Sequence, residues 1–164
     1  MNAVLQPQRT HGRAKLKLAG RIYQCLEALP DQVFGESLKV QAAENTLLDA
    51  DVLVTCNAAD LATGKTFSAP LLVIEVLLSR TQAYDRIKKF AVSRRRTALR
   101  EYVLVDSDIR RVEAFRRNAV GEWVLHDISE GPALVLGCIE TSAPMADMFD
   151  CVVLSAAETA QANT

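Results

Sequence analysis

The segment 71–78 constrains the fold more than any other part of the chain, because every residue in it except Glu75 is apolar. A strand with one face in water alternates apolar and polar side chains, whereas a strand covered on both faces is apolar throughout. Residues 71–78 are therefore predicted to form a central strand with helices on both sides. Glu75 then places a carboxylate in the core, where a charge requires a partner.

The elements around this strand are predicted from hydrophobic periodicity. Residues 11–29 are expected to form an amphipathic helix, because apolar side chains recur every three or four residues at Leu16, Ala19, Ile22, Tyr23, Leu26 and Leu29. A second helix is expected over residues 81–96, with an apolar stripe of Ile87, Phe90 and Ala91. Strands are predicted at 33–42, 47–56, 101–106, 111–117, 122–126 and 133–136, a loop at 57–68, and a short helix at 144–149.

This order of elements predicts an α/β fold with a mixed central β-sheet flanked by helices. The chain has 164 residues, of which 49% are hydrophobic and 24% are charged, and is expected to form a single domain over residues 11–154. Residues 1–10 and 155–164 are expected to be flexible ends. No apolar run approaches the roughly 20 residues of a membrane helix, and residues 1–20 lack the apolar centre of a signal peptide, so a cytoplasmic location is expected.

The four cysteines are widely separated and form no Cys-x-x-Cys pair or Cys/His cluster. A structural zinc site is therefore not expected. Without a secretory signal, the default expectation is a set of free, buried thiols at Cys25, Cys56, Cys138 and Cys151.

Positive charge is concentrated between residues 86 and 117, although the net charge of the chain is only -1. This segment holds eleven Lys and Arg residues against four Asp and Glu residues. A local basic face is what neutralisation of nucleic-acid phosphates requires. A solvated helix face followed by polar hairpin edges would give the same composition, and the sequence leaves both interpretations open.

A second acidic residue, Asp51, lies in the apolar strand predicted at 47–56. If the two strands are neighbours, Asp51 and Glu75 can face one another, and such a pair repels unless a cation lies between them. Oxygen ligands with water suit Mg²⁺ or Mn²⁺. The alternative for Glu75 is an ion pair with a Lys or Arg, or a place at the exposed end of its strand. Asp49 shares a face with Asp51 and is interpreted as a polar residue at the strand entry.

Two lysines, Lys88 and Lys89, lie in the helix that follows the Glu75 strand. A lysine that leans back over the end of the strand could hold or deprotonate an attacking water. Alternatively, both lysines are solvated and one of them pairs with Asp85 at helical spacing.

Three stretches in this order resemble the Uma-type putative restriction endonuclease family, within the PD-(D/E)XK nuclease superfamily. They are Ala-Pro-Leu-Leu-Val-Ile-Glu-Val-Leu at 69–77, Thr-x-x-Tyr-Asp-Arg-x-x-Lys-Phe at 81–90 and Leu-Arg-Glu-Tyr-Val-Leu-Val at 99–105. The strand around Asp51, the hairpin that starts at Arg111 and the helix that contains His11 also resemble parts of this family. The likeness covers about residues 10–150.

The resemblance implies a restriction-endonuclease-like core and a metal-dependent endonuclease that hydrolyses phosphodiester bonds in DNA. Asp51 and Glu75 would be the catalytic acids and the ligands of Mg²⁺ or Mn²⁺. The superfamily lysine would be displaced from the Glu75 strand to the next helix, at Lys89. The residues that would hold flanking DNA phosphates are Arg94, Arg95 and Arg96, or alternatively Arg110 and Arg111.

The sequence also departs from the family pattern. Ala50 replaces the proline before the Asp, residues 78–80 replace Ser-Pro-Ser, and Ser93 replaces a tyrosine. Residues 1–10 hold no counterpart of the acidic Tyr-Glu-Leu-x-Asp-Gly-Glu stretch with which the family usually begins. The alternative expectation is therefore a degenerate, non-catalytic nuclease fold that binds nucleic acid or a protein. A homo-oligomeric structural protein is a further alternative, and a homodimer is compatible with each interpretation.

Overall fold

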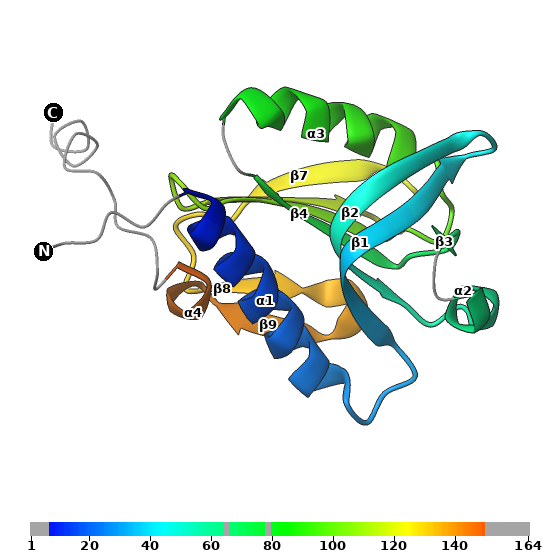
Figure 1. The fold of residues 1–164 in the computed structure, drawn as a ribbon, viewed down its shortest axis with the longest axis horizontal. Coiled ribbons are helices and arrows are strands. Elements are labelled where there is room, and N and C mark those ends of the chain that lie inside the picture. The colour runs from blue at the N-terminus through cyan, green and yellow to red at the C-terminus, as the bar shows by residue number, and fades with distance from the viewer. Residues whose placement is uncertain (1–6, 64–65, 78–79, 150–164) are drawn as a thin grey trace, which may run out of the picture.

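The computed structural model describes residues 7–63, 66–77 and 80–149 (Figure 1). The helices are α1 (Pro7–Leu26), α2 (Ala58–Thr63), α3 (Arg80–Ser93), the 3-10 turn η1 (Gly137–Ile139) and α4 (Met145–Phe149). The strands are β1 (Gln32–Ala43), β2 (Thr46–Thr55), β3 (Thr66–Phe67), β4 (Leu72–Leu77), β5 (Glu101–Asp106), β6 (Arg111–Arg117), β7 (Trp123–Asp127), β8 (Ala133–Leu136) and β9 (Thr141–Pro144).

The main sheet has seven strands in the order β3-β1-β2-β4-β5-β6-β7. β1 pairs with β3, and β4 with β5, in parallel, whereas the other neighbouring strands pair antiparallel. The sheet is therefore mixed, as predicted. β4 is its middle strand and all six of its residues are buried, which confirms the assignment made from the apolar run around Glu75.

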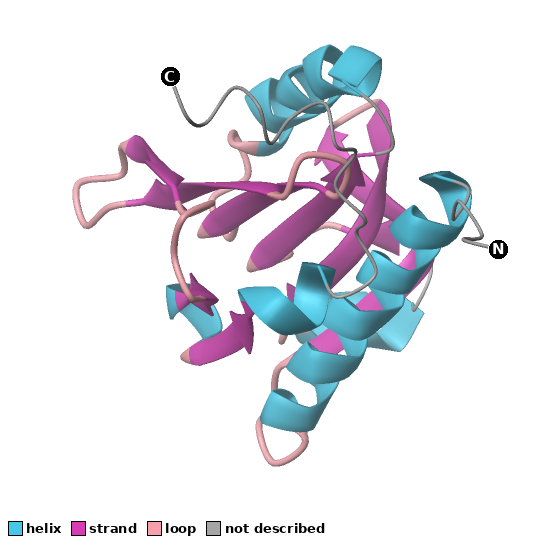
Figure 2. Ribbon diagram, turned by 90° about the vertical axis from the view of Figure 1, so that its left-hand side faces the viewer, coloured by secondary structure: helices cyan, strands magenta, loops and turns pink. Residues whose placement is uncertain are grey.

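Helices cover both faces of this sheet (Figures 1 and 2). On one face, α1, α4 and the two-stranded β8–β9 sheet pack against alternate residues of the central strands, including Ile74 and Val76 of β4. On the other face, Phe90 of α3 packs with the intervening residues, including Val73 and Leu77. Glu75 lies between Val73 and Leu77 in β4, and its side chain faces α3.

Both long helices are present, but their buried faces differ from the prediction. α1 begins at Pro7 instead of residue 11, and its buried row is Ala14, Leu18, Ile22 and Leu26. Leu16 and Tyr23, assigned to the stripe from their spacing, are 75% and 61% exposed.

The face of α3 was also predicted wrongly. Phe90 is buried, but Ile87 and Ala91 are exposed. The inward face of the helix carries Arg86 and Lys89 instead, and apolar periodicity does not register charged side chains that point toward a buried carboxylate.

The remaining differences concern short elements. Residues 57–68, predicted to be a loop, contain α2 and β3, and β9 was not predicted. These segments are six residues or shorter, too short for a period to be recognised. Of the predicted flexible ends, residues 7–10 are helical, and residues 1–6 and 150–164 lie outside the described part of the chain.

Three cysteines fall within the described ranges, and all three are free: Cys25, Cys56 and Cys138. Cys56 is exposed, which contradicts the expectation of a buried thiol, and Cys151 lies outside those ranges. No helix among the described residues combines the length and apolar character that crossing a membrane requires.

Candidate active site

The candidate site lies where β2 and β4 separate. The two strands pair antiparallel from Val54 opposite Leu72 to Val52 opposite Ile74. The paired stretch ends at Val52, so the adjacent Asp51 is not part of it. Beyond Val52, side chains take the place of the backbone hydrogen bonds between β2 and β4. Asp51 Oδ2 accepts a hydrogen bond from the Val76 backbone N–H at 2.8 Å, and His11 Nε2 lies 2.6 Å from the Val76 carbonyl oxygen. Both backbone polar groups of Val76 are thereby satisfied at the fork between the strands.

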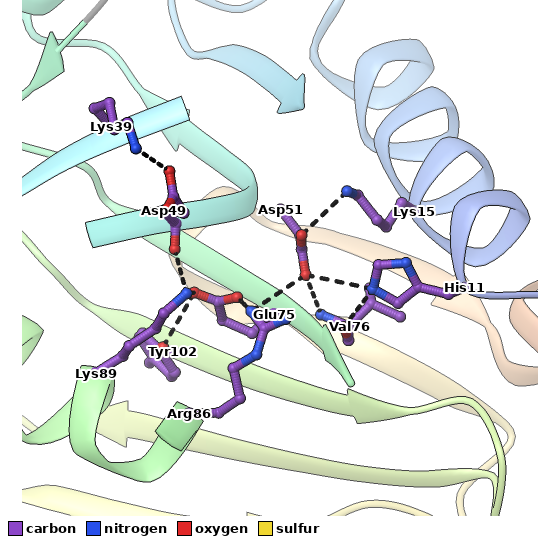
Figure 3. A network of polar contacts seen from close by, with 10 residues as sticks. All are labelled: His11, Lys15, Lys39, Asp49, Asp51, Glu75, Val76, Arg86, Lys89 and Tyr102. Atoms are coloured by element: carbon purple, nitrogen blue, oxygen red, sulfur yellow. Dashed lines mark hydrogen bonds and ion pairs between the residues drawn. The ribbon is translucent and has the colours of Figure 1, made fainter. Parts of the chain in front are cut away.

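Positively charged groups from two helices surround the Asp51 carboxylate (Figure 3). Lys15 Nζ of α1 lies 3.1 Å from Oδ1, and Arg86 Nη1 of α3 lies 3.5 Å from Oδ2. His11, one helical turn before Lys15, brings Nε2 to 3.9 Å from Oδ2. The His11 contact with a carbonyl oxygen requires a proton on Nε2, and this N–H donates to Val76 and not to Asp51.

Glu75 is 1% exposed and has three polar partners. The Arg86 guanidinium forms an ion pair with Oε2, Lys89 Nζ lies 3.3 Å from Oε1, and the Tyr102 hydroxyl lies 3.5 Å from Oε1. Burial raises the pKa of Tyr102, which keeps the hydroxyl protonated and able to donate. Of the two alternatives to a metal ligand considered for Glu75, the structure shows an ion pair with Arg and Lys. It excludes a place at the exposed end of the strand, because Glu75 is buried.

Arg86 contacts both acids through the same nitrogen, Nη1. The carboxylates of Asp51 and Glu75 therefore converge on one position, as predicted for neighbouring strands. The side chains that surround this position are between 13% and 23% exposed, apart from the buried Glu75. The position is consequently shielded from bulk water but close to the surface.

Lys89, and not Lys88, reaches the acids. Its Nζ contacts Glu75 and donates a 2.7 Å hydrogen bond to the backbone carbonyl of Asp49. Burial and the neighbouring Arg86 guanidinium lower the pKa of Lys89, while Asp51 and Asp49 act in the opposite direction. Lys88 is exposed, and the side chain of Asp85, its predicted partner, is not among the described ones.

Asp49 contributes its backbone to the site, but not its carboxylate. The carboxylate is 67% exposed and forms an ion pair with Lys39, with 2.5 Å between Nζ and Oδ1. The hydrogen bond from Lys39 lowers the pKa of Asp49. This placement agrees with its interpretation as a polar residue at the strand entry.

The basic segment does not form one continuous face. Arg86 and Lys89 turn toward the acids, Arg111 pairs with Glu113, and Arg116 pairs with Glu101. Arg117 donates hydrogen bonds to the carbonyl oxygens of residues 94, 96 and 97. Much of the positive charge is thus engaged within the protein.

Arg94, Arg95 and Arg96 follow the last turn of α3, near the end of the sheet where β4 and β5 begin. Arg94 and Arg95 are exposed, and Arg96 is half-buried. Among the contacts recorded for the described residues, none joins these arginines to Asp51 or Glu75. The structure therefore separates this predicted DNA contact from the acidic pair.

The donor set suits a hard divalent cation. Two carboxylates converge on a single position, and Mg²⁺ is commonly held by one or two carboxylates while it keeps several waters. Within residues 7–63, 66–77 and 80–149, no group of three or more His, Cys, Asp or Glu side chains could hold a metal ion. The residues therefore fit an ion with two protein carboxylates and a hydrated remainder, and do not fit a fully protein-ligated cation.

Sequence reasoning missed Arg86 and Lys15. Their helical spacing offers a signal: Arg86 precedes Lys89 by three residues, and Lys15 follows His11 by four, so each pair shares a helix face. Tyr102 is buried in the core, and its hydroxyl also faces Glu75.

The fold has a counterpart among solved structures. A crystal structure of a putative nuclease belonging to DUF820, from Anabaena variabilis, superimposes with a TM-score of 0.65 over 88% of this chain and 82% of that chain. The sequence identity is 16%, so this likeness concerns the fold. The restriction-endonuclease-like α/β architecture predicted from the sequence is thereby supported.

Residues 3–143 match the sequence profile of Uma2, described as putative restriction endonuclease, and the chain belongs to this family. It is also 27% identical, over 135 residues, to an uncharacterised protein of Synechocystis sp.. That match spans 82% of this chain and 71% of the relative.

Proposed function

We propose that this protein is a metal-dependent endonuclease that hydrolyses phosphodiester bonds in DNA. The observation that carries the proposal is the convergence of the Asp51 and Glu75 carboxylates on one cation position beside Lys89. Membership of a family described as putative restriction endonucleases supports the choice of a nucleic acid as substrate.

In this proposal Asp51 and Glu75 hold Mg²⁺ or Mn²⁺. The ion, when bound, polarises a phosphate oxygen and lowers the pKa of water. Asp51 is fixed for this role by the Val76 N–H and by Lys15, and Glu75 by its place in the central strand.

Lys89 is the residue that acts on water or on the developing charge. Its ammonium group lies beside Glu75 and is anchored by the Asp49 carbonyl oxygen, so its position is fixed. From there it can orient an attacking water or stabilise the additional negative charge of the transition state. The lowered pKa of Lys89 makes transfer of its proton easier than from an ordinary lysine.

Arg94, Arg95 and Arg96 are proposed to contact flanking DNA phosphates. Exposed arginines bind phosphates without reading the base sequence. They would add affinity and a dependence on salt concentration, but no sequence specificity.

The second candidate is a non-catalytic nucleic-acid or protein binder on the same fold. Lys15, Arg86 and Lys89 already compensate the charges of Asp51 and Glu75, as in a site that has no need of metal. The homodimer suggested by the family resemblance stays a prediction under either function.

The decisive experiment is plasmid cleavage with Mg²⁺ or Mn²⁺ by the wild type, by Asp51→Asn and by Asp49→Asn. Asp49 is a matched control, because it lies on the same strand two residues away and its carboxylate points to Lys39. We expect cleavage by the wild type and Asp49→Asn, and none by Asp51→Asn. DNA binding without cleavage by all three proteins would overturn the enzyme and favour the binder.

A further inference from the structure

Arg86 occupies the position where the two acids meet. Its Nη1 forms an ion pair with Glu75 Oε2 and lies 3.5 Å from Asp51 Oδ2 (Figure 3). Each of the two neighbouring lysines contacts one acid: Lys15 contacts Asp51, and Lys89 contacts Glu75. Among the described side chains, only Arg86 is recorded in ion pairs with both carboxylates.

This arrangement makes Arg86 a substitute for a divalent ion. Two carboxylates close together cannot both remain ionised without a cation between them. A guanidinium stays charged at every physiological pH and suits carboxylate geometry. Arg86 therefore lies between the two carboxylates as a shared counter-ion.

A divalent ion and the guanidinium cannot occupy this position together. An ion ligated by both carboxylates would require the oxygens that Arg86 now contacts, and the two like charges would repel each other within a few ångströms. One of them must leave. Arg86 is the candidate to leave, because its side chain is long, is carried by the surface helix α3 and is 14% exposed, whereas Glu75 lies in the central strand.

We propose that Arg86 is an internal counter-ion that competes with the metal ion for Asp51 and Glu75, and so sets the metal affinity of the site. The proposal rests on the metal site of the proposed function. Metal binding then includes the displacement of Arg86 from both carboxylates. The apparent affinity is then the intrinsic affinity multiplied by the fraction of molecules in which the acids are free of Arg86.

The test is a calorimetric titration with Mn²⁺ of the wild type, Arg86→Met and Lys88→Met. Lys88 is the matched control, because it lies on the same helix, is exposed and carries the same charge. Arg86→Met is expected to bind Mn²⁺ about tenfold or more tightly than the wild type, and Lys88→Met within about threefold. If Arg86→Met does not fold, Arg86→Gln removes the same charge and carries the same expectation.

A melting experiment gives a second, independent reading. In EDTA, Arg86→Met should melt at a lower temperature than the wild type, because its two acids have lost a shared cation. The same concentration of Mn²⁺ should raise its melting temperature by more than that of the wild type, since stabilisation by a ligand grows with the logarithm of the ratio of its concentration to Kd. A side chain with only a structural role would lower stability without tightening metal binding.

The outcomes separate this inference from the proposed function. If the wild type binds Mn²⁺ and Arg86→Met binds it equally or more weakly, the competition is refuted and the metal site stands. If neither protein binds Mn²⁺, the metal site is refuted and the competition falls with it. Tighter binding by Arg86→Met that disappears in Arg86→Met/Glu75→Gln supports both.

Discussion

Glu75 and Glu101 are buried glutamates on the neighbouring strands β4 and β5, exposed by 1% and 3% respectively, but their partners differ in kind. Glu101 receives hydrogen bonds from Arg116 Nε at 2.8 Å and from the backbone N–H groups of Gly137 and Cys138, both at 3.3 Å. It thereby joins β5 to β6 and to the turn between β8 and β9. Within the part of the chain that the structure describes, Glu75 is bound only by side chains, namely Arg86, Lys89 and Tyr102.

This difference distinguishes the two carboxylates by the kind of partner they have. A backbone N–H cannot move away without distortion of the fold, whereas the contacts of Glu75 are made by the side chains of Arg86, Lys89 and Tyr102. Asp60 belongs with Glu101, since it is 2% exposed and accepts hydrogen bonds from the backbone N–H groups of Ser68 and Ala69. Burial alone therefore does not distinguish Glu75 from these two acids, and the kind of partner does.

Among the cations that contact Glu75, Lys89 is expected to have the largest effect on cleavage. Lys89→Met should reduce cleavage by about 100-fold, the lower range for loss of a group that assists proton transfer. Mn²⁺ should still bind, because both carboxylates remain. The measurement is a cleavage rate at saturating Mn²⁺ together with a titration.

Lys88→Met is the control for that rate, because Lys88 is exposed on the adjacent position of α3. Equal rates for the two variants would show that the contact between Lys89 and Glu75 has no catalytic role.

The comparison is tested directly when the same substitution is made in both glutamates. Glu101→Gln should lower the free energy of unfolding by about 2 kcal/mol, because an amide group would face the N–H donors of Gly137 or Cys138 and the ion pair with Arg116 would be lost. For a domain of this size this corresponds to roughly 4–8 °C in melting temperature. Denaturant unfolding measures it.

Glu75→Gln is the matched variant and should lower stability by less than Glu101→Gln does, because the recorded partners of Glu75 are side chains and not backbone N–H groups. It should abolish Mn²⁺ binding, which Glu101→Gln should preserve. A larger loss of stability in Glu75→Gln than in Glu101→Gln would reverse the assignment of the two acids.

The smallest effect is expected for arginines that contact neither glutamate. Arg94→Gln combined with Arg95→Gln should weaken DNA binding, and should reduce the slope of log affinity against log salt by about 2. Mn²⁺ affinity should not change, because these side chains are exposed at the end of α3. Fluorescence anisotropy over a series of salt concentrations measures the slope, and an unchanged slope would remove these residues from the DNA interface.

The sequence predicted the central part of the fold well. The apolar run around Glu75 predicted β4 and the helices on both of its faces, and β5 follows its predicted range because it too is buried along its whole length. The partly exposed strands β6 and β7 also follow their predicted ranges closely, from the hairpin pattern. The prediction was poorer for the exposed side of α1, where Leu16 and Tyr23 fit the period but face water. Periodicity finds a helix more reliably than it finds which of two adjacent rows is buried.

The sequence by itself determined that Glu75 is buried in a central strand and that Asp51 lies on a second apolar strand, since both follow from composition along a strand. Only the tertiary structure decided which cations meet these acids. Arg86 and Lys15 come from helices on opposite faces of the sheet, and their side chains reach the acids because β2 and β4 separate at Asp51. Contacts between residues far apart in sequence depend on how strands and helices pack, and a local sequence pattern does not encode which distant residues will meet.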